Sequence, residues 1–231
     1  MKFTITRIDP NKDSLDYEVD FSPLSPDTKP TALDVLLQVQ ENIFPDLAYR
    51  YGCRNALCGV CTIEVNGKPK LACKHKLREN DHITSFSSLP TIRDFVVRRD
   101  LVNKQLQGHL EKDQDNGIVS SDPAAVEKFD SLNQCIECYA CLDGCPLHEK
   151  NEEGGHTEAL PYGNPYAFLK AQQAIVDPQA TSKSKEKALS FATDLGLNTC
   201  IDCDGCKCGV GINLMREVIN PLLDAKSAQE K

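Results

Sequence analysis

The sequence is poor in features that would place it in several common protein classes. It has no tryptophan and only 6% aromatic residues, so its hydrophobic cores must be small and mainly aliphatic. Basic residues are also fewer than acidic ones: the chain has 26 Lys and Arg and 34 Asp and Glu, which gives a net charge of −8. This balance argues against a nucleic-acid partner, since phosphate backbones need a basic face to bind.

Long apolar segments are missing as well. The first ten residues alternate polar and apolar side chains and lack the apolar core of a signal peptide. No window approaches the roughly 18 uninterrupted apolar residues of a membrane helix. These absences favour a cytoplasmic protein, and they leave open a peripheral position on the cytoplasmic face of the membrane.

Cysteine, in contrast, is abundant. The 231 residues include 12 cysteines, which fall in three groups at 53–73, 135–145 and 200–208. In a reducing cytosol, metal ligation or redox chemistry explains them better than six disulfides do. The long intervals between the groups suggest two domains, at residues 1–91 and 92–231.

The first domain has the pattern of a small α+β fold. Alternating side chains at residues 3–8 and 17–21 predict two strands. Thr31 is placed to cap a helix whose apolar residues recur at helical spacing. The Asn66-Gly67 pair predicts a tight turn in a hairpin over residues 62–73, because both positions tolerate positive φ.

The second domain is predicted to be all-α. Amphipathic patterns predict helices at residues 94–107, 123–132, 166–176, 184–195 and 212–223. Residues 113–117 and 151–155 are predicted to be exposed loops.

The first cysteine group has the plant-type [2Fe-2S] spacing: Cys53-x4-Cys58-x2-Cys61, followed after eleven residues by Cys73. Three thiolates must converge from one tight loop, and the fourth must approach from a neighbouring strand. The loop also contains glycines, which let backbone N–H groups come close to a cluster. A structural zinc site is the alternative, but zinc sites favour pairs of Cys-x2-Cys and fit this spacing badly.

The second group, Cys135-x2-Cys138-x2-Cys141-x3-Cys145-Pro146, has the spacing of the bacterial ferredoxin run. Its first three cysteines would bind a [4Fe-4S] cluster, whereas the fourth would ligate another cluster.

The third group is Cys200-x2-Cys203-x2-Cys206-x-Cys208. Three sets of four ligands would use every cysteine of the chain. Cys208 lies last, so we assign it to the cubane of Cys135, Cys138 and Cys141. A third cluster would then be held by Cys145, Cys200, Cys203 and Cys206.

The remaining polar residues give weaker signals. His148, close after Cys145, either bonds to a cluster sulfide or is a plain surface residue. His75 lies in a basic run, Lys74 to Arg78, that either docks an acidic partner or is a solvated face. The sequence contains no nucleophile–base arrangement, phosphate loop or dinucleotide fingerprint, so no catalytic residue is predicted.

These motifs resemble the iron–sulfur subunit of succinate dehydrogenase and fumarate reductase. The resemblance rests on residues 51–61, Asn66-Gly67, residues 71–73 and the run 135–146, with residues 94–97 resembling the helix that opens the family's second domain. It implies a β-grasp [2Fe-2S] ferredoxin domain followed by an all-α two-cluster ferredoxin domain. It also implies a flavoprotein partner with FAD, and electron transfer to a quinone at membrane anchor subunits.

The chain departs from the family pattern at its third group. A two-residue deletion before Cys208 explains the short last gap, and Cys203 is an additional ligand that favours [4Fe-4S] over the family's usual [3Fe-4S]. Ile201 occupies the position of the family's quinone-site His, and the usual Trp is absent. Ala56 replaces a usual Gly in the first loop without removing a ligand.

The predicted function is that of an electron-transfer subunit of an oxidoreductase, without a substrate site of its own. Its acceptor is a quinone, or, in a related soluble flavin oxidoreductase, a thiol/disulfide or protein partner such as a Cys-rich subunit. A zinc-binding interaction module is the alternative from another class.

Overall fold

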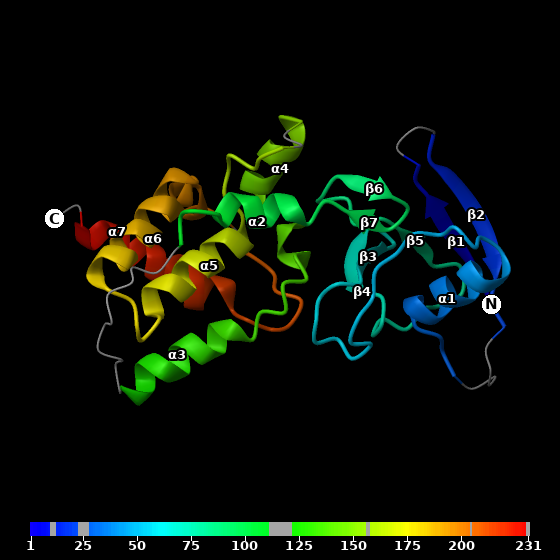
Figure 1. The fold of residues 1–231 in the computed structure, drawn as a ribbon, viewed down its shortest axis with the longest axis horizontal. Coiled ribbons are helices and arrows are strands. Elements are labelled where there is room, and N and C mark those ends of the chain that lie inside the picture. The colour runs from blue at the N-terminus through cyan, green and yellow to red at the C-terminus, as the bar shows by residue number, and fades with distance from the viewer. Residues whose placement is uncertain (10–12, 23–27, 111–121, 156–157, 204, 230–231) are drawn as a thin grey trace. The chain divides into compact units, whose positions relative to one another are not determined.

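The computed structural model divides the chain into two compact units, which are drawn in Figure 1. The first unit combines residues Met1–Arg98 with Glu137–Asp143, and the second combines Arg99–Ile136 with Gly144–Lys231. The structure describes residues 1–9, 13–22, 28–110, 122–155, 158–203 and 205–229. No helix in these ranges combines the length and apolar character that crossing a membrane requires.

A five-stranded mixed sheet forms the centre of the first unit. Its strands are β1 (Lys2–Arg7), β2 (Leu15–Asp20), β3 (Thr62–Val65), β4 (Lys68–Leu71) and β5 (His82–Thr84), in the order β2-β1-β5-β3-β4. β1 runs parallel to β5, and the other neighbouring pairs are antiparallel. Asn66 and Gly67 connect β3 to β4 with φ of 52° and 68°. The predicted strands and the predicted hairpin turn are therefore confirmed.

Helix α1 (Ala32–Asn42) packs on this sheet. The Thr31 hydroxyl accepts a hydrogen bond from the N–H of Asp34, whose carboxylate accepts from the N–H of Thr31. The core joins buried residues of the helix and of β1, β3 and β5: Leu33, Val35, Leu36, Val39, Ile5, Ile63 and Ile83. Each such side chain contributes roughly 1.5–3 kcal/mol when it is buried. The N–H of Leu33 also donates to the carbonyl of Ala72 at 2.9 Å, which holds the chain beside Cys73.

The predicted helix over residues 94–107 is wrong in its first half. Short strands β6 (Thr91–Arg93) and β7 (Val96–Val97) pair here, and helix α2 begins only at Asp100 (Asp100–Leu106). The turn between the strands places Asp94 at φ 44°. The Asp94 carboxylate is buried, where it accepts from the N–H of Ala48 at 2.9 Å and pairs with Arg7 at 3.1 Å. These tertiary bonds outweigh the local helical pattern, so residues 94–97 do not open the second unit as a helix.

Replacing Arg7 with Met is expected to destabilise the first unit by about 3 kcal/mol, because the buried Asp94 would lose its bidentate cation. The matched control is Arg93→Met. Arg93 and Asp46 pair with side chains that are 44% and 58% exposed, and Arg93 reaches Asp94 only at 3.7 Å. Its loss should therefore cost less than about 1 kcal/mol. Anaerobic urea unfolding of the full chain measures the loss of stability in both variants. Equal shifts of the unfolding midpoint in Arg7→Met and Arg93→Met would contradict the prediction.

The second unit is built mainly from helices. They are α2, α3 (Pro123–Asn133), α4 (Pro146–Glu153), α5 (Pro165–Val176), α6 (Ser182–Asp194) and α7 (Asn220–Gln229), with a 3-10 turn η2 (Leu197–Cys200) and a π-helical segment η3 (Met215–Ile219). The central helix α5 packs against α2, α3, α6 and η3 (Figure 1). The helices predicted at residues 123–132, 166–176 and 184–195 are confirmed to within two residues.

Two other predictions for this unit are corrected. The predicted loop at residues 151–155 is wrong for residues 151–153, because α4 continues to Glu153 and the Asn151 side chain is buried, whereas residues 154–155 form an exposed turn. The predicted helix at 212–223 begins later, since Asn213 accepts from the N–H of Arg216 in the manner of an N-cap. The other predicted loop, at 113–117, lies outside the described residues.

A buried polar network ties α2, α4 and the start of α5 together. Gln105 donates to the carbonyls of Leu160 and Tyr162 at 2.6 and 2.7 Å, and accepts from the Asn164 amide at 2.7 Å. Asn151 exchanges two hydrogen bonds with the backbone of Tyr162. Because these groups are satisfied inside the unit, they fix the position of α4, which starts directly after Cys145.

Candidate iron–sulfur sites

The loop from Gly52 to Cys61 directs backbone N–H groups at cysteine sulfurs. The N–H groups of Asn55 and Leu57 donate to Cys53 Sγ at 3.4 and 3.2 Å, and the N–H of Cys53 donates to Cys58 Sγ at 3.4 Å. Such bonds favour the thiolate form and tune an iron–sulfur centre. A Cβ on Gly52 would lie 3.4 Å from Cys58 Sγ, so the glycine leaves room beside the sulfur.

The path of this loop depends on left-handed backbone conformations. Arg54, Ala56 and Gly59 have φ of 56°, 54° and 62°. Ala56, which replaces a usual glycine, thus adopts a conformation that glycine would adopt more easily, at a cost of roughly 1 kcal/mol. The substitution preserves the glycine-like path of the loop.

Cys61 and Cys73 lie at one end of the β3–β4 hairpin. Thr62 pairs with Leu71, so Cys61 before β3 and Cys73 after β4 are neighbours. The N–H of Ala72 donates to the Cys61 carbonyl at 2.9 Å, and the N–H of Cys73 donates to Cys61 Sγ. Cys58 and Cys73 both interact electrostatically with Cys61. The contacts thus link Cys53 with Cys58, and Cys61 with Cys58 and Cys73. The complete ligand set Cys53, Cys58, Cys61 and Cys73 stays a prediction.

The second group is divided between the two units: Cys138 and Cys141 belong to the first, Cys135 and Cys145 to the second. Glu137 and Tyr139 flank Cys138 with φ of 55° and 60°, and residues Ala140–Leu142 form a 3-10 turn, η1. These conformations reverse the chain sharply around Cys138. The ligand set predicted for this group, with Cys208, stays a prediction.

The third group lies beside Cys145 in the second unit. Cys145 precedes α4, and the N–H groups of Leu147 and His148 in its first turn donate to Cys145 Sγ. Cys145 interacts electrostatically with Cys203, and both act on Cys200 and Cys206. The set predicted for the third cluster, Cys145, Cys200, Cys203 and Cys206, stays a prediction.

Cys208 has a backbone donor of its own, the N–H of Val210, at 3.5 Å from its Sγ.

The thiols differ in acidity with their surroundings. Hydrogen bonds from the N–H groups of Asn55 and Leu57 lower the pKa of the exposed Cys53 to about 7. Burial raises the pKa of Cys61 to about 11, and it raises the pKa values of Cys200 and Cys206 to about 12. Buried thiols of this kind give up their protons readily only to a metal, which fits ligand sites.

In the cluster-free protein, Cys53 is expected to react first with iodoacetamide at pH 7, because about half of it is thiolate. Cys200 and Cys206 should react last, since their raised pKa values keep them protonated until the pH approaches about 12. Mass spectrometry of tryptic peptides after short labelling measures the order. Labelling of Cys206 as fast as Cys53 would contradict it.

The two histidines singled out from the sequence lie in different surroundings. His148 is 1% exposed, so its interpretation as a surface residue is wrong, and its Nε2 lies 3.6 Å from the carboxylate of Glu152. His75 is partly buried, and burial together with the charges of Lys70 and Arg78 lowers its pKa. Its role stays open between docking and a solvated face.

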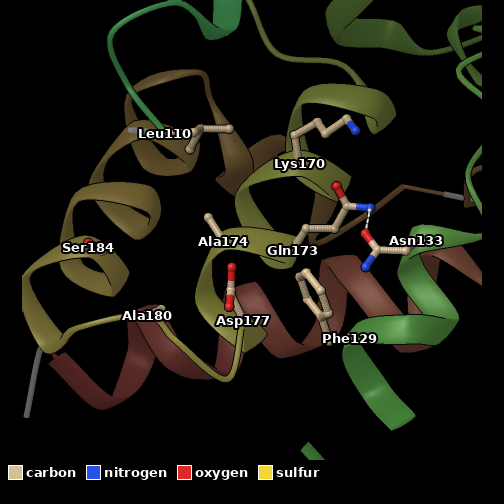
Figure 2. Close-up of a pocket in the computed structure, with 9 residues that line it drawn as sticks. All are labelled: Leu110, Phe129, Asn133, Lys170, Gln173, Ala174, Asp177, Ala180 and Ser184. Atoms are coloured by element: carbon tan, nitrogen blue, oxygen red, sulfur yellow. Dashed lines mark hydrogen bonds between the residues drawn. The ribbon is translucent and has the colours of Figure 1, made fainter. Parts of the chain in front are cut away.

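A cavity of about 220 Å³ lies in the second unit, and its lining residues are drawn in Figure 2. The Gln173 amide points toward Asn133 and donates to its side-chain oxygen at 3.0 Å, and it donates to the Leu132 carbonyl at 2.9 Å. Asp177 accepts from the N–H of Gln179. These polar groups serve the fold, and no cysteine is among the described lining residues.

Thr62 is a residue that the sequence analysis missed. It is buried and donates a hydrogen bond to the carbonyl of Cys138 at 2.8 Å. Its position directly after the predicted ligand Cys61 was the available signal.

Comparisons with known proteins bear on the family and the fold of the chain. A family model described as a 2Fe-2S iron-sulfur cluster binding domain matches residues 2–104. The chain is 30% identical to succinate dehydrogenase [ubiquinone] iron-sulfur subunit 1, mitochondrial, of Oryza sativa subsp. japonica, over 94% of this chain and 79% of that protein. It resembles a chain of the apo Sdh1 complex of Mycobacterium smegmatis with a TM-score of 0.80, at 22% identity, over 99% and 95% of the two chains, which supports the fold.

Longer proteins are also similar. An uncharacterized iron–sulfur protein of Methanocaldococcus jannaschii is 32% identical, over 88% of this chain but 39% of its own length. A subunit of the fumarate reductase (CoM/CoB) of Methanothermobacter marburgensis is 25% identical, over 84% of this chain and 38% of its length. The chain thus spans about two fifths of these two relatives. The alignment with the rice protein covers most of both chains at 30% identity. On that ground the chain belongs to the family of succinate dehydrogenase and fumarate reductase iron–sulfur subunits.

Proposed function

We propose that this chain is the electron-transfer subunit of a succinate dehydrogenase/fumarate reductase-type complex. It relays electrons between a partner flavoprotein that carries FAD and a quinone or another acceptor. The observation that carries the proposal is the set of 12 cysteines in three groups, in which Cys58 and Cys73 act on Cys61, and Cys145, Cys200 and Cys203 act on Cys206. Membership of the family supports it, and the match to a 2Fe-2S domain speaks against a zinc-binding module.

Three ligand sets would hold the clusters. The set for [2Fe-2S] is Cys53, Cys58, Cys61 and Cys73; the set for the first [4Fe-4S] is Cys135, Cys138, Cys141 and Cys208; the set for the third cluster, [4Fe-4S] rather than [3Fe-4S], is Cys145, Cys200, Cys203 and Cys206. The donors fit such clusters because all of them are thiols, and several accept backbone N–H bonds. When bound, each cluster supplies reversible one-electron chemistry.

The residues around the sulfurs determine how readily each site holds an electron. The N–H groups of Asn55 and Leu57 partly neutralise the charge at Cys53, and those of Leu147 and His148 do so at Cys145. Burial of Cys61 and Cys200, which are 3% and 7% exposed, excludes water and disfavours added negative charge. Both effects act within each of these two sites, so the potential of each site is set by their balance.

An apolar part of the first loop is available for the flavoprotein. Leu57 is 67% exposed and Tyr51 is 41% exposed, although both are large apolar side chains. A partner that covers them would bring its flavin near the [2Fe-2S] site, which is the entry or exit point of the relay.

A thiol/disulfide couple is the second candidate for the electron acceptor at the end of the relay opposite the flavoprotein. The chain has no Trp, and Ile201, which is 63% exposed, follows Cys200 where the family has a His. The relative from Methanothermobacter marburgensis, whose name includes CoM/CoB, supports this alternative. A soluble Cys-rich subunit would then take the place of membrane anchors.

Anaerobic purification of the chain from its native cells, together with a partner that contains FAD, tests the proposal. About ten irons per chain with matching labile sulfide are expected, together with reduction of the clusters by succinate or by the substrate of the flavoprotein. Parallel assays with a quinone and with a heterodisulfide distinguish the two acceptors. A colourless protein that contains zinc instead of iron would refute the relay.

A further inference from the structure

Thr62 is a buried polar residue at the first position of β3. It is 5% exposed, and its Oγ1 lies 2.8 Å from the carbonyl oxygen of Cys138 and 3.1 Å from that of Gly59. All three residues belong to the first unit. The hydroxyl carries one hydrogen, and the nearer oxygen, that of Cys138, is its better acceptor. Thr62 therefore holds the segment around Cys138 against the start of β3, an inner strand of the sheet.

This hydrogen bond joins two segments that each carry a proposed cluster ligand. Cys61 precedes Thr62 in the chain, and the backbone donors of Ala72 and Cys73 hold its carbonyl and its sulfur. Cys138 is 8% exposed. An electron-transfer pathway of covalent bonds and one hydrogen bond thus runs from Cys61 Sγ through Thr62 to Cys138 Sγ, and it needs no through-space jump.

We propose that Thr62 is a positioning residue that couples the [2Fe-2S] site of Cys61 to the site of Cys138. The proposal rests on the proposed function, since both sites must hold clusters. One electron leaves one site and is gained by the other, while the hydroxyl hydrogen stays on Oγ1 and no bond is exchanged. The hydrogen bond keeps the Cys138 peptide against β3. Without this bond, the electron-transfer pathway between the two sites would include a through-space jump.

The test compares three variants of the full chain, purified without oxygen in its complex. Thr62→Val keeps the shape but removes the donor, and Thr62→Ser keeps the hydroxyl. Thr193→Val is the matched control, because it removes a hydroxyl that donates to the Leu189 carbonyl at 2.9 Å within α6. Rapid-freeze paramagnetic resonance measures electron transfer between the two sites, and spectra of the fully reduced protein measure their magnetic interaction.

Thr62→Val is expected to slow transfer between the sites by about tenfold and to weaken the magnetic interaction, as removal of an outer partner of a metal site does. Thr62→Ser and Thr193→Val should behave as the parent protein. If Thr62→Val does not fold, Thr62→Ala is compared with Thr62→Ser, and a loss of coupling in Thr62→Ala alone supports the proposal.

An unchanged rate and interaction in Thr62→Val or Thr62→Ala, with both clusters present, would overturn this role of Thr62 and leave the relay intact. Absence of cluster signals from the parent protein would instead overturn the proposed function.

Discussion

Replacing Cys203 with Ala should convert the third cluster from a four-iron to a three-iron form. Cys145, Cys200 and Cys206 remain as ligands, and they lie close to one another in the second unit. A cubane that loses one ligand readily releases the iron at that corner, so the iron content should fall by about one per chain. The oxidised variant should also gain the paramagnetic signal of a three-iron cluster, which the parent lacks.

Cys208→Ala provides the comparison for this prediction. Cys208 is assigned to the cubane of Cys135, Cys138 and Cys141, so its loss should alter that cluster and leave the third one unchanged. Iron analysis and low-temperature paramagnetic resonance of both variants distinguish the two assignments. An oxidised parent protein that already shows the three-iron signal, or a Cys203→Ala variant without it, would refute the role given to Cys203.

Replacing Cys61 with Ala is expected to interrupt the relay at its first step. Cys61 is 3% exposed at the start of β3, and no other cysteine can take its place in the hairpin. The variant should lose the [2Fe-2S] signal and about two irons per chain. Reduction of the other clusters through the flavoprotein should slow by on the order of 100-fold, since a metal ligand is at least as important as its outer partners.

The control is Ser85→Ala, which removes a buried hydroxyl of similar size from the same unit, where it bonds to Thr91 at 2.8 Å. Stopped-flow spectroscopy follows reduction of the flavin and of the clusters separately. Flavin reduction should be unchanged in both variants. Cluster reduction at the parent rate in Cys61→Ala would show that electrons do not enter through this site.

Local patterns predicted much of the fold. Thr31 and Asp34 form the expected cap of α1, because both partners lie within one turn. Asn66 and Gly67 form the expected turn, because the preference for positive φ belongs to the residues themselves. The grouping of Cys53, Cys58 and Cys61 could likewise be predicted, since a short loop keeps its ligands together.

Predictions failed where contacts with residues far away in the sequence determine the local structure. Asp94 looked like the start of a helix, but Arg7 and Ala48, far away in sequence, hold its carboxylate in a turn. Asn151 looked like a loop residue, yet the backbone of Tyr162 satisfies its amide inside the unit. His148 is buried for a similar reason, as it lies on the covered face of α4.

The sequence by itself determined three groups of cysteines at cluster-ligand spacings and their order along the chain, and the residues around them carried the resemblance to the family. Only the tertiary structure decided which thiols are exposed and which are buried. It alone revealed that the Thr62 hydroxyl reaches Cys138. Burial and contacts between distant segments arise from packing of the whole chain, which no local pattern of residues encodes.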